Sequence, residues 1–159
     1  MTDGAERRFR FRSDWRIPAP AAAVFAVLEN VEDYPAWWPQ VREVIRDGPD
    51  SGRCRFRSFL PFELRVTATA ARRDPAAGLL EVVLAGDLDG RVRWLLRPRP
   101  GGTAVRYEQD TALRKPGLRR LARPARPLLI ANHALMMRAG RRGLRARLGV
   151  RAGSHLDEG

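Results

Sequence analysis

The sequence has few residues that could bind a metal or form a disulfide. Its 159 residues include one cysteine, Cys54, and two histidines, His133 and His155. A single cysteine cannot form a disulfide within the chain, and these three side chains do not make a zinc ligand set. We therefore expect no metal site. The sequence also has no Gly-x-Ser-x-Gly motif, so nucleophilic catalysis has no support.

Long apolar runs are absent as well. No segment approaches the length of a transmembrane helix, and the first dozen residues carry charges such as Asp3 and Glu6 where a signal peptide would be apolar. We therefore expect a cytoplasmic protein. Its length fits one domain with a core large enough to enclose a ligand cavity. We place this ligand-binding domain at residues 8–150, between a flexible N-terminus (1–7) and a flexible tail (151–159).

Acidic residues are scarce relative to basic ones. There are 18 against 30, which gives a formal net charge of +12. A cluster of basic residues would indicate nucleic acid binding. Here every basic residue except Lys115 is arginine, and the arginines are spread over predicted strands, turns and helix as a compositional bias would spread them. We therefore do not expect nucleic acid as a partner, whereas an anionic membrane surface remains a candidate partner.

Alternating apolar and polar residues predict that most of the chain is β-sheet. In residues 9–17, Phe9, Phe11 and Ile17 belong to an apolar set that alternates with polar and charged residues, the period of a half-buried strand. Six further strands are expected between turns rich in glycine, proline and aspartate. They cover residues 41–47, 53–59, 62–73, 79–86, 91–97 and 103–113.

Helical spacing is confined to two parts of the sequence. It predicts a helix over residues 21–30, and Pro35 and Pro39 limit a second helix to about one or two turns. Residues 128–148 form a long helix with an apolar stripe on one face and arginines on the other. The stripe is Leu129, His133, Met137, Gly140, Leu144 and Leu148, and the arginines are Arg138, Arg141, Arg142, Arg145 and Arg147.

The apolar stripe must be covered by another part of the chain. We therefore predict the α+β class: a curved antiparallel sheet of seven strands wrapped around the long C-terminal helix, with two short helices between the first two strands. The space between sheet and helix is the expected ligand cavity.

One end of the sheet is the candidate mouth of this cavity. Successive hairpins lie at alternate ends of an antiparallel sheet, so the break at Leu60, the turn at residues 87–90 and the connection at residues 114–127 share one end. The break at Leu60 is apolar, unlike the other turns. We expect Trp37 and Trp38 at the same end, because they directly precede the second strand.

Polar side chains on the last strand are candidates for ligand contact. Tyr107, Gln109 and Thr111 share a face with Val105 and Leu113, which indicates that this face points inward. The three polar residues could orient a ligand. They could equally be core residues that satisfy one another or bind buried water. The sequence leaves both interpretations open.

His133 lies on the apolar stripe of the long helix and faces the sheet. An imidazole there could act as a base or a proton shuttle. A lone histidine on a core face is more often a structural group with a hydrogen-bonded neighbour. Our hypothesis is that His133 contacts a bound ligand.

Aromatic residues are concentrated in one corner of the chain. This segment is too short to bury all three of its large aromatic side chains, Tyr34, Trp37 and Trp38. At least one of them is therefore expected to face the cavity or its rim. The alternative is that the three together close that end of the sheet. Trp94 lies on the same face of its strand as Val92 and Leu96 and is most simply a core residue.

Several motifs, taken with the order of elements, resemble the START-like (SRPBCC) helix-grip superfamily, in its polyketide cyclase/dehydrase and lipid-transport branch. The resemblance covers residues 8–150. The motifs are Tyr34-Pro35-Ala36-Trp37-Trp38-Pro39, Leu60-Pro61-Phe62, Gly86-Asp87-Leu88-Asp89-Gly90 with Trp94, Gly101-Gly102-Thr103, Lys115-Pro116, and Asn132-His133 with Met137 and Gly140.

The resemblance implies a deep cavity for a hydrophobic small molecule and no obligatory cofactor. Aromatase/cyclase members of the branch have an aromatic-proline corner, matched here by Tyr34-Pro35, and a pocket tyrosine whose position holds Val41. They also use an arginine near the end of the fourth strand. Its nearest match is Arg72 if the alignment has a gap, and Thr69 if it has none.

These considerations give a set of candidate site residues. The catalytic candidates are His133, Tyr107 and Arg72. The expected ligand contacts are Tyr34, Trp37, Trp38, Phe56, Ser58, Leu60, Phe62, Trp94, Gln109, Thr111 and Met137.

Three functions remain open on the sequence. The first is a cofactor-free polyketide cyclase, aromatase or dehydratase, as in antibiotic biosynthesis, with an acyl carrier protein as a candidate partner. Such chemistry needs a shaped cavity, a base and a hydrogen-bond donor for the developing enolate oxygen.

The second function is a lipid, isoprenoid or quinone carrier or sensor that docks on anionic membranes through the apolar residues 59–62 and the arginine-rich residues 114–126. The third is association with ribosomes or RNA, as in some relatives.

Overall fold

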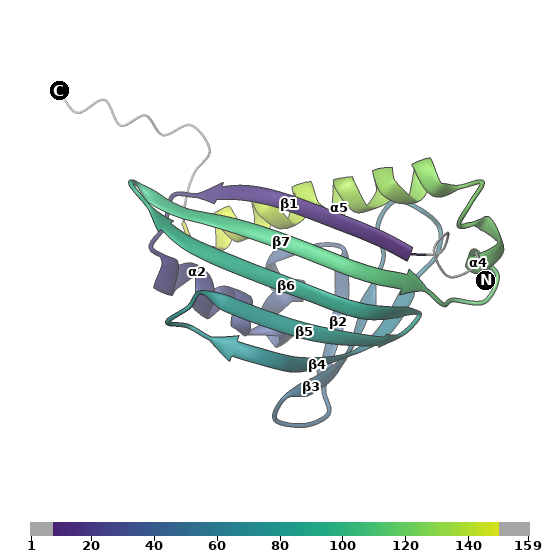
Figure 1. Cartoon of the computed structure of the whole chain (residues 1–159), viewed down its shortest axis with the longest axis horizontal. Helices are drawn as coiled ribbons and strands as arrows, with labels where there is room; N and C mark the ends of the chain where they lie inside the picture. The colour runs from purple at the N-terminus through teal and green to yellow at the C-terminus, as the bar shows by residue number, and fades with distance from the viewer. Residues whose placement is uncertain (1–7, 150–159) are drawn as a thin grey trace.

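The computed structural model describes residues 8–149, which form a curved antiparallel sheet gripping a long helix (Figure 1). Within this range the sheet has seven strands in the order β1-β7-β6-β5-β4-β3-β2. The predicted helix-grip fold is confirmed, including two short helices between β1 and β2. The termini expected to be flexible, residues 1–7 and 151–159, lie outside the described residues.

The elements follow one another in the order expected from the sequence. The strands are β1 (Arg8–Ile17), β2 (Val41–Arg46), β3 (Ser51–Phe56), β4 (Leu64–Asp74), β5 (Leu79–Gly86), β6 (Leu88–Arg99) and β7 (Gly102–Leu113). The helices are α2 (Ala21–Glu29), the single 3-10 turn η1 (Val31–Asp33), α3 (Tyr34–Trp37), α4 (Leu118–Leu121) and α5 (Arg126–Arg147). The short helix α4 was not predicted; it lies in the proline- and arginine-rich connection before α5.

Strand β7 is the clearest case of a sequence pattern becoming a face of the sheet. Its residues alternate between buried and partly exposed along its whole length. It pairs with β1 on one side and β6 on the other, so that Val105 lies opposite both Trp15 and Leu96. The buried face of β7 therefore points to the core, as its alternation predicted.

Several strand boundaries differ from the prediction by two or three residues, and two regions show the tertiary contacts involved. Strand β6 begins at Leu88, before the expected residue 91, since its pairing with β7 continues to Leu113. The connection between β3 and β4 is longer than expected and comprises residues 57–63. This loop leaves the sheet for α5: Ser58 Oγ donates to the Asn132 carbonyl at 3.3 Å, and the Leu60 N–H donates to Asn132 Oδ1 at 3.2 Å.

The three connections predicted to share one end of the sheet do so. The N–H of Arg65, at the start of β4, donates to the Asp87 carboxylate at 2.8 Å. The N–H of Arg114, after β7, donates to the Asp87 carbonyl at 2.7 Å. Asp87 therefore joins three connections at this end, and its role is structural, as expected of a turn residue.

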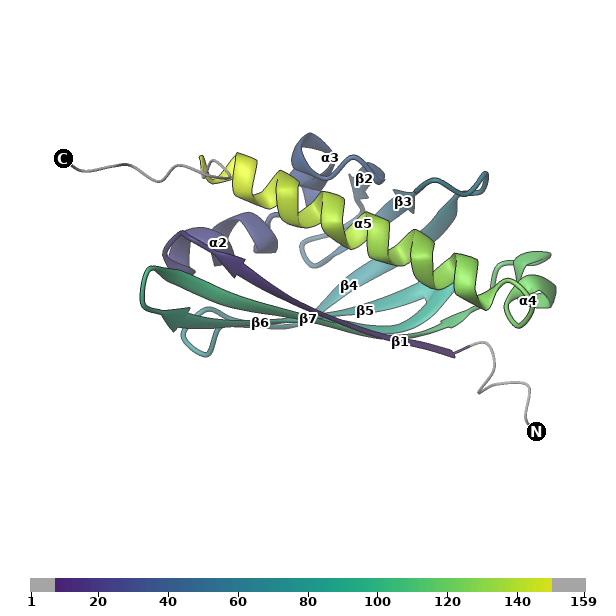
Figure 2. The same ribbon diagram turned by 90° about the horizontal axis from the view of Figure 1, so that it is seen from above.

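Helix α5 lies along the concave side of the sheet, with α3 beside its C-terminal half and α4 at its N-terminal end (Figure 2). Its buried residues are Met137, Gly140 and Leu144, all members of the predicted stripe. Ion pairing between Arg147 and Asp33 also connects the end of α5 to η1.

Trp37 and Trp38 pack on α5 at two glycines. A Cβ on Gly140 would lie 2.5 Å from the Trp38 ring, and one on Gly143 would collide with the Trp37 carbonyl oxygen. The Trp38 indole N–H also donates to the Met136 carbonyl at 2.8 Å. Only residues without a side chain allow this close approach.

The position of the tryptophans corrects one prediction. We expected Trp37 and Trp38 at the mouth beside Leu60, yet Leu60 contacts Asn132 whereas Trp37 contacts Gly143. Eleven residues of helix span about 16 Å. The start of β2 does lie beside the loop that holds Leu60, since the N–H of Arg57 donates to the Gln40 carbonyl at 2.8 Å, and Trp38 lines the cavity. Trp37, however, packs on the far half of α5, because strand order alone does not show where a short helix packs.

The contact between α3 and α5 predicts the effect of one substitution. Alanine normally favours a helix over glycine by about 1 kcal/mol. At Gly143, however, the added methyl group would displace the Trp37 backbone, so we expect Gly143→Ala to lower the free energy of unfolding by about 1–3 kcal/mol in urea denaturation. As a control, Gly48→Ala adds a methyl group 3.3 Å from Ser51 Oγ on the surface and should change stability by less than about 0.5 kcal/mol. A Gly143→Ala variant as stable as the wild type would contradict the contact.

Candidate functional site

A cavity of about 170 Å³ lies between the concave face of the sheet and the N-terminal half of α5. This is about ten times the volume that one buried water requires, so the cavity can hold an organic molecule. Its wall is mostly apolar. The apolar lining residues are Phe9, Phe11, Val31, Val41, Val44, Phe56, Phe62, Leu64, Ala68, Val82, Leu84, Leu88, Val92, Leu113, Leu129 and Met136.

Most of the predicted site residues line this cavity. They come from α3, the loop after β3, and the inward faces of β3, β6 and β7, together with one residue of α5. They are Tyr34, Trp38, Phe56, Phe62, Trp94, Tyr107, Gln109, Thr111 and His133. Val41, which the resemblance aligned with a pocket tyrosine, lines it too.

Arg72 is not brought to the cavity. Counting by twos from Val66, which is buried, would point Arg72 inward. The pairing of β4 with β5 shifts register between Ala70 and Arg72, however, and the Arg72 side chain is exposed. Such a bulge breaks the two-residue period and cannot be seen in the sequence. The alternative match, Thr69, is also exposed.

Four other predicted ligand contacts lie outside the cavity lining. Trp37 and Met137 are buried in the filled part of the core. Ser58 and Leu60 belong to the loop that is hydrogen-bonded to Asn132, and their neighbour Phe62 lines the cavity instead. Of the three loop residues that were expected at the site, only Phe62 therefore reaches the cavity.

The helix residues at the cavity were only partly predicted. Leu129, Asn132, His133 and Met136 line it, with spacings of three, one and three residues. The predicted stripe continued from His133 to Met137, whereas the lining face turns to Met136. Helical spacing could have indicated Met136, because a stripe that passes through Leu129 and His133 can continue to either Met136 or Met137.

Three polar side chains of β7 form a hydrogen-bonded ladder with His133. The Tyr107 hydroxyl donates to Gln109 Oε1 at 2.5 Å, and Gln109 Nε2 donates to Thr111 Oγ1 at 2.9 Å. His133 Nε2 lies 3.0 Å from Gln109 Oε1. An amide oxygen can only accept, so Nε2 of His133 carries the proton and Nδ1 has the lone pair. The ladder links the helix to the sheet across the cavity wall.

The environment of His133 favours its neutral form. Its ring stacks on Phe11, with centroids 3.7 Å apart and planes 7° apart. Burial lowers the pKa of His133 to about 4, because the imidazolium would lose its hydration. His133 is therefore uncharged at neutral pH, and the Nδ1 lone pair can accept a hydrogen bond.

The other ionisable side chains of the wall are neutral as well. Burial raises the pKa of the Tyr107 hydroxyl and of the Tyr34 hydroxyl, and Tyr34 donates to the Leu28 carbonyl at 2.6 Å. Burial also raises the pKa of the Cys54 thiol to about 11, so the reactive thiolate is not populated at neutral pH. Cys54 serves here as a small apolar residue of the wall.

Residues 8–149 contain neither a metal-binding cluster nor a membrane-spanning helix. Among the residues that the structure describes, there is no group of three or more histidine, cysteine, aspartate or glutamate side chains able to hold a metal ion. Within the same described range, no helix combines the length and the apolar character that crossing a bilayer requires.

The sequence matches one protein family, and several solved structures share the fold. Over residues 8–149 the sequence matches the family described as polyketide cyclase/dehydrase and lipid transport. None of the curated protein sequences matches the chain. The Zhui aromatase/cyclase from Streptomyces sp. R1128 has a similar structure, with a TM-score of 0.73 and 16% identity over 89% of this chain and 94% of that one.

Two further solved structures share the architecture. The protein TTHA0849 from Thermus thermophilus has a TM-score of 0.74 and 19% identity over 88% of this chain and 97% of its own. A START superfamily protein from Mycobacterium smegmatis has a TM-score of 0.69 and 14% identity, covering 88% of this chain and 97% of its own. At these identities the likeness shows the fold alone.

The lowered pKa of His133 predicts a pH dependence of stability. Between pH 6.5 and about 4 the unfolded chain binds a proton at His133 that the folded chain does not, so stability falls as the pH falls through this window. The wild type should lose about 1 kcal/mol per pH unit more than a His133→Gln variant, as measured by urea denaturation at several pH values. Parallel pH profiles for the two proteins would show that His133 is not buried in its neutral form.

Proposed function

The chain belongs to the polyketide cyclase/dehydrase and lipid transport family, and we propose that it binds a hydrophobic small molecule between its sheet and α5. In this proposal the bound molecule is a poly-keto chain, and the protein acts on it as a cofactor-independent cyclase, aromatase or dehydratase. The observation that carries the proposal is an apolar cavity with one hydrogen-bonded polar ladder on its wall.

The chemistry of such a reaction fits the groups on the wall. Ring closure joins an enol carbon to a carbonyl carbon; a base removes a proton, and a donor stabilises the developing negative charge on oxygen. His133 offers the neutral base through Nδ1, and the β7 ladder offers hydroxyl and amide donors. Apolar walls would hold the chain folded so that the reacting carbons meet.

Filling the cavity provides a test of this proposal. Ala68 lines the cavity from β4, whereas Ala71 on the same strand is exposed. We expect the protein, purified gently from its own host, to carry an aromatic or poly-keto compound detectable by native mass spectrometry. Ala68→Phe should lose most of this compound, because the ring would occupy the cavity, and the control Ala71→Phe should retain it.

The identity of the extracted compound separates the functions. An unmodified phospholipid, quinone or isoprenoid in the wild type would overturn the catalytic proposal and favour a carrier. Equal occupancy in Ala68→Phe and Ala71→Phe would mean that the compound binds elsewhere.

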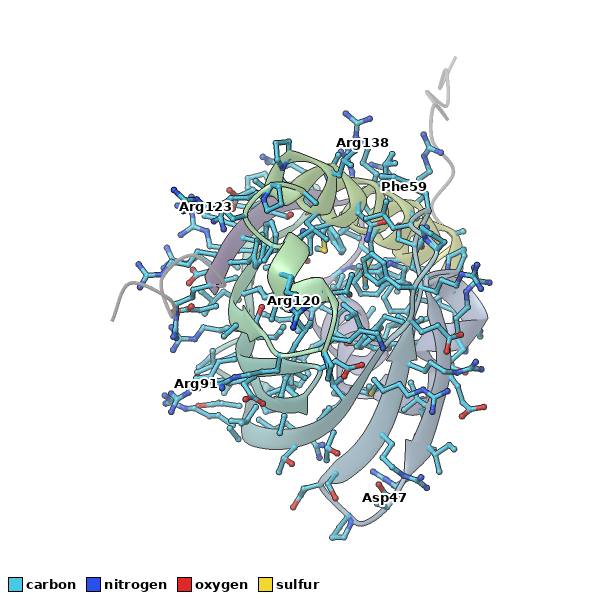
Figure 3. All side chains as sticks on the ribbon, turned by 90° about the vertical axis from the view of Figure 1, so that its right-hand side faces the viewer. Asp47, Phe59, Arg91, Arg120, Arg123 and Arg138 are labelled. Carbon is cyan, nitrogen blue, oxygen red and sulfur yellow. The ribbon has the colours of Figure 1, made fainter. Side chains whose placement is uncertain are left out.

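A specific observation favours the carrier as a second candidate function. Large apolar side chains are exposed beside the candidate mouth: Phe59 is 51% exposed, Leu128 56% and Leu135 46%. Figure 3 looks at this end of the molecule and shows Phe59 and Arg138 projecting outward, with Arg120 on α4 below them. Apolar side chains among arginines would suit docking on an anionic membrane.

Vesicle binding tests the docking surface formed by Phe59, Leu128 and Leu135. Vesicles containing phosphatidylglycerol should bind the protein, and vesicles of phosphatidylcholine alone should not, with binding weakened by salt. Phe59→Ser combined with Leu128→Ser should weaken binding at least about tenfold, since two apolar side chains would no longer be buried in the bilayer. As a control, Val83→Ser changes an exposed apolar residue on β5. Equal binding by the double variant and the control would rule out this surface.

A further inference from the structure

The described wall of the cavity has no side chain with a formal charge. It consists of apolar groups and of hydroxyl, thiol, amide, indole and imidazole groups. Although the chain has many arginines, none is among the described residues that line the cavity. A carboxylate or an ammonium group on a ligand would lose its hydration in this cavity without gaining a counter-ion, which is strongly unfavourable. The wall therefore favours an uncharged ligand.

Several other polar atoms around the cavity are already hydrogen-bonded within the protein. The Tyr34 hydroxyl donates to the Leu28 carbonyl at 2.6 Å, and the Trp38 indole N–H donates to the Met136 carbonyl at 2.8 Å. The Asn132 Oδ1 accepts the N–H of Leu60 at 3.2 Å. The bonded atoms hold the fold, so they offer little to a ligand; the side-chain NH2 of Asn132 is not used by these bonds.

Gln109 is the centre of the ladder, and it retains unused hydrogen-bonding capacity. Its Oε1 accepts from Tyr107 and from His133, and one N–H donates to Thr111 Oγ1. These bonds leave free the second N–H of Gln109 and, within residues 8–149, the hydroxyl hydrogen of Thr111. Both are neutral donors on a buried wall, and a ligand oxygen could satisfy them.

We propose that Gln109 selects the ligand by donating a hydrogen bond to one uncharged oxygen, a carbonyl or a hydroxyl, on an otherwise apolar molecule. The cavity correspondingly discriminates against carboxylates and amines of the same shape. This inference rests on the proposed function, since it concerns the same cavity. It goes further by assigning the polarity of the ligand and the residue that recognises it.

A series of two-ring aromatic probes tests the inference at neutral pH by isothermal titration calorimetry. The probes are naphthalene, 2-naphthol, 2-acetylnaphthalene and 2-naphthoate. We expect 2-naphthol and 2-acetylnaphthalene to bind about fivefold tighter than naphthalene, the gain of one net hydrogen bond. We expect 2-naphthoate to bind at least about tenfold more weakly than 2-naphthol, because its charge would be buried without a partner.

Variants then assign the preference to Gln109. Gln109→Met keeps the length of the side chain without its hydrogen bonds, and should abolish the preference for 2-naphthol over naphthalene while naphthalene binding is retained. Glu108→Gln, on the opposite face of β7, is the control and should leave the whole series unchanged. If Gln109→Met does not fold, Thr111→Val removes the end of the ladder and should reduce the same preference.

The outcomes separate this inference from the proposed function. Binding of 2-naphthoate as tight as that of 2-naphthol, or an unchanged preference in a folded Gln109→Met or Thr111→Val variant, would overturn the inference and leave hydrophobic binding in place. Failure of every probe to bind, naphthalene included, would count against the proposed function itself.

Discussion

The contact between α3 and α5 at Gly140 and Gly143 decides where this protein has a cavity. At these glycines the helix approaches the tryptophan corner so closely that a single methyl group would not fit. Met137 and Leu144, on the same half of α5, lie in a filled core. The preceding turns, from Leu129 to Met136, face the cavity instead. The helix is thus fixed tightly at one half and spans an unfilled space at the other.

The polar ladder gives this apolar cavity one polar side. Tyr107, Gln109 and Thr111 lie on one strand, and His133 reaches the ladder from the opposite wall. A group of neutral hydrogen-bonding side chains can be buried because its members satisfy one another. The donors left over would fix the orientation of a ligand, whether the protein transforms that ligand or only carries it.

The positive charge of the chain is kept outside the cavity. Many of the arginines form exposed ion pairs, such as that of Arg53 with Asp47 at 3.1 Å and that of Arg106 with Asp14 at 3.0 Å. Exposed pairs of this kind contribute little to stability. The charge therefore acts at the surface, where it would matter for an anionic partner, and the interior remains neutral.

The sequence by itself determined the fold and the composition of the ladder. Alternation defined β7 and placed Tyr107, Gln109 and Thr111 on one inward face, while helical spacing placed His133 opposite them. These periods are local properties of the backbone, so a sequence can show them.

Only the tertiary structure decided which of the other candidates reach the cavity. Arg72 turns outward at a register shift, the helix presents Met136 in place of Met137, and the loop containing Leu60 is fixed by Asn132. Each outcome depends on packing or pairing between segments far apart in the chain. A local period carries no information about such contacts, because they are set by how the elements fit together.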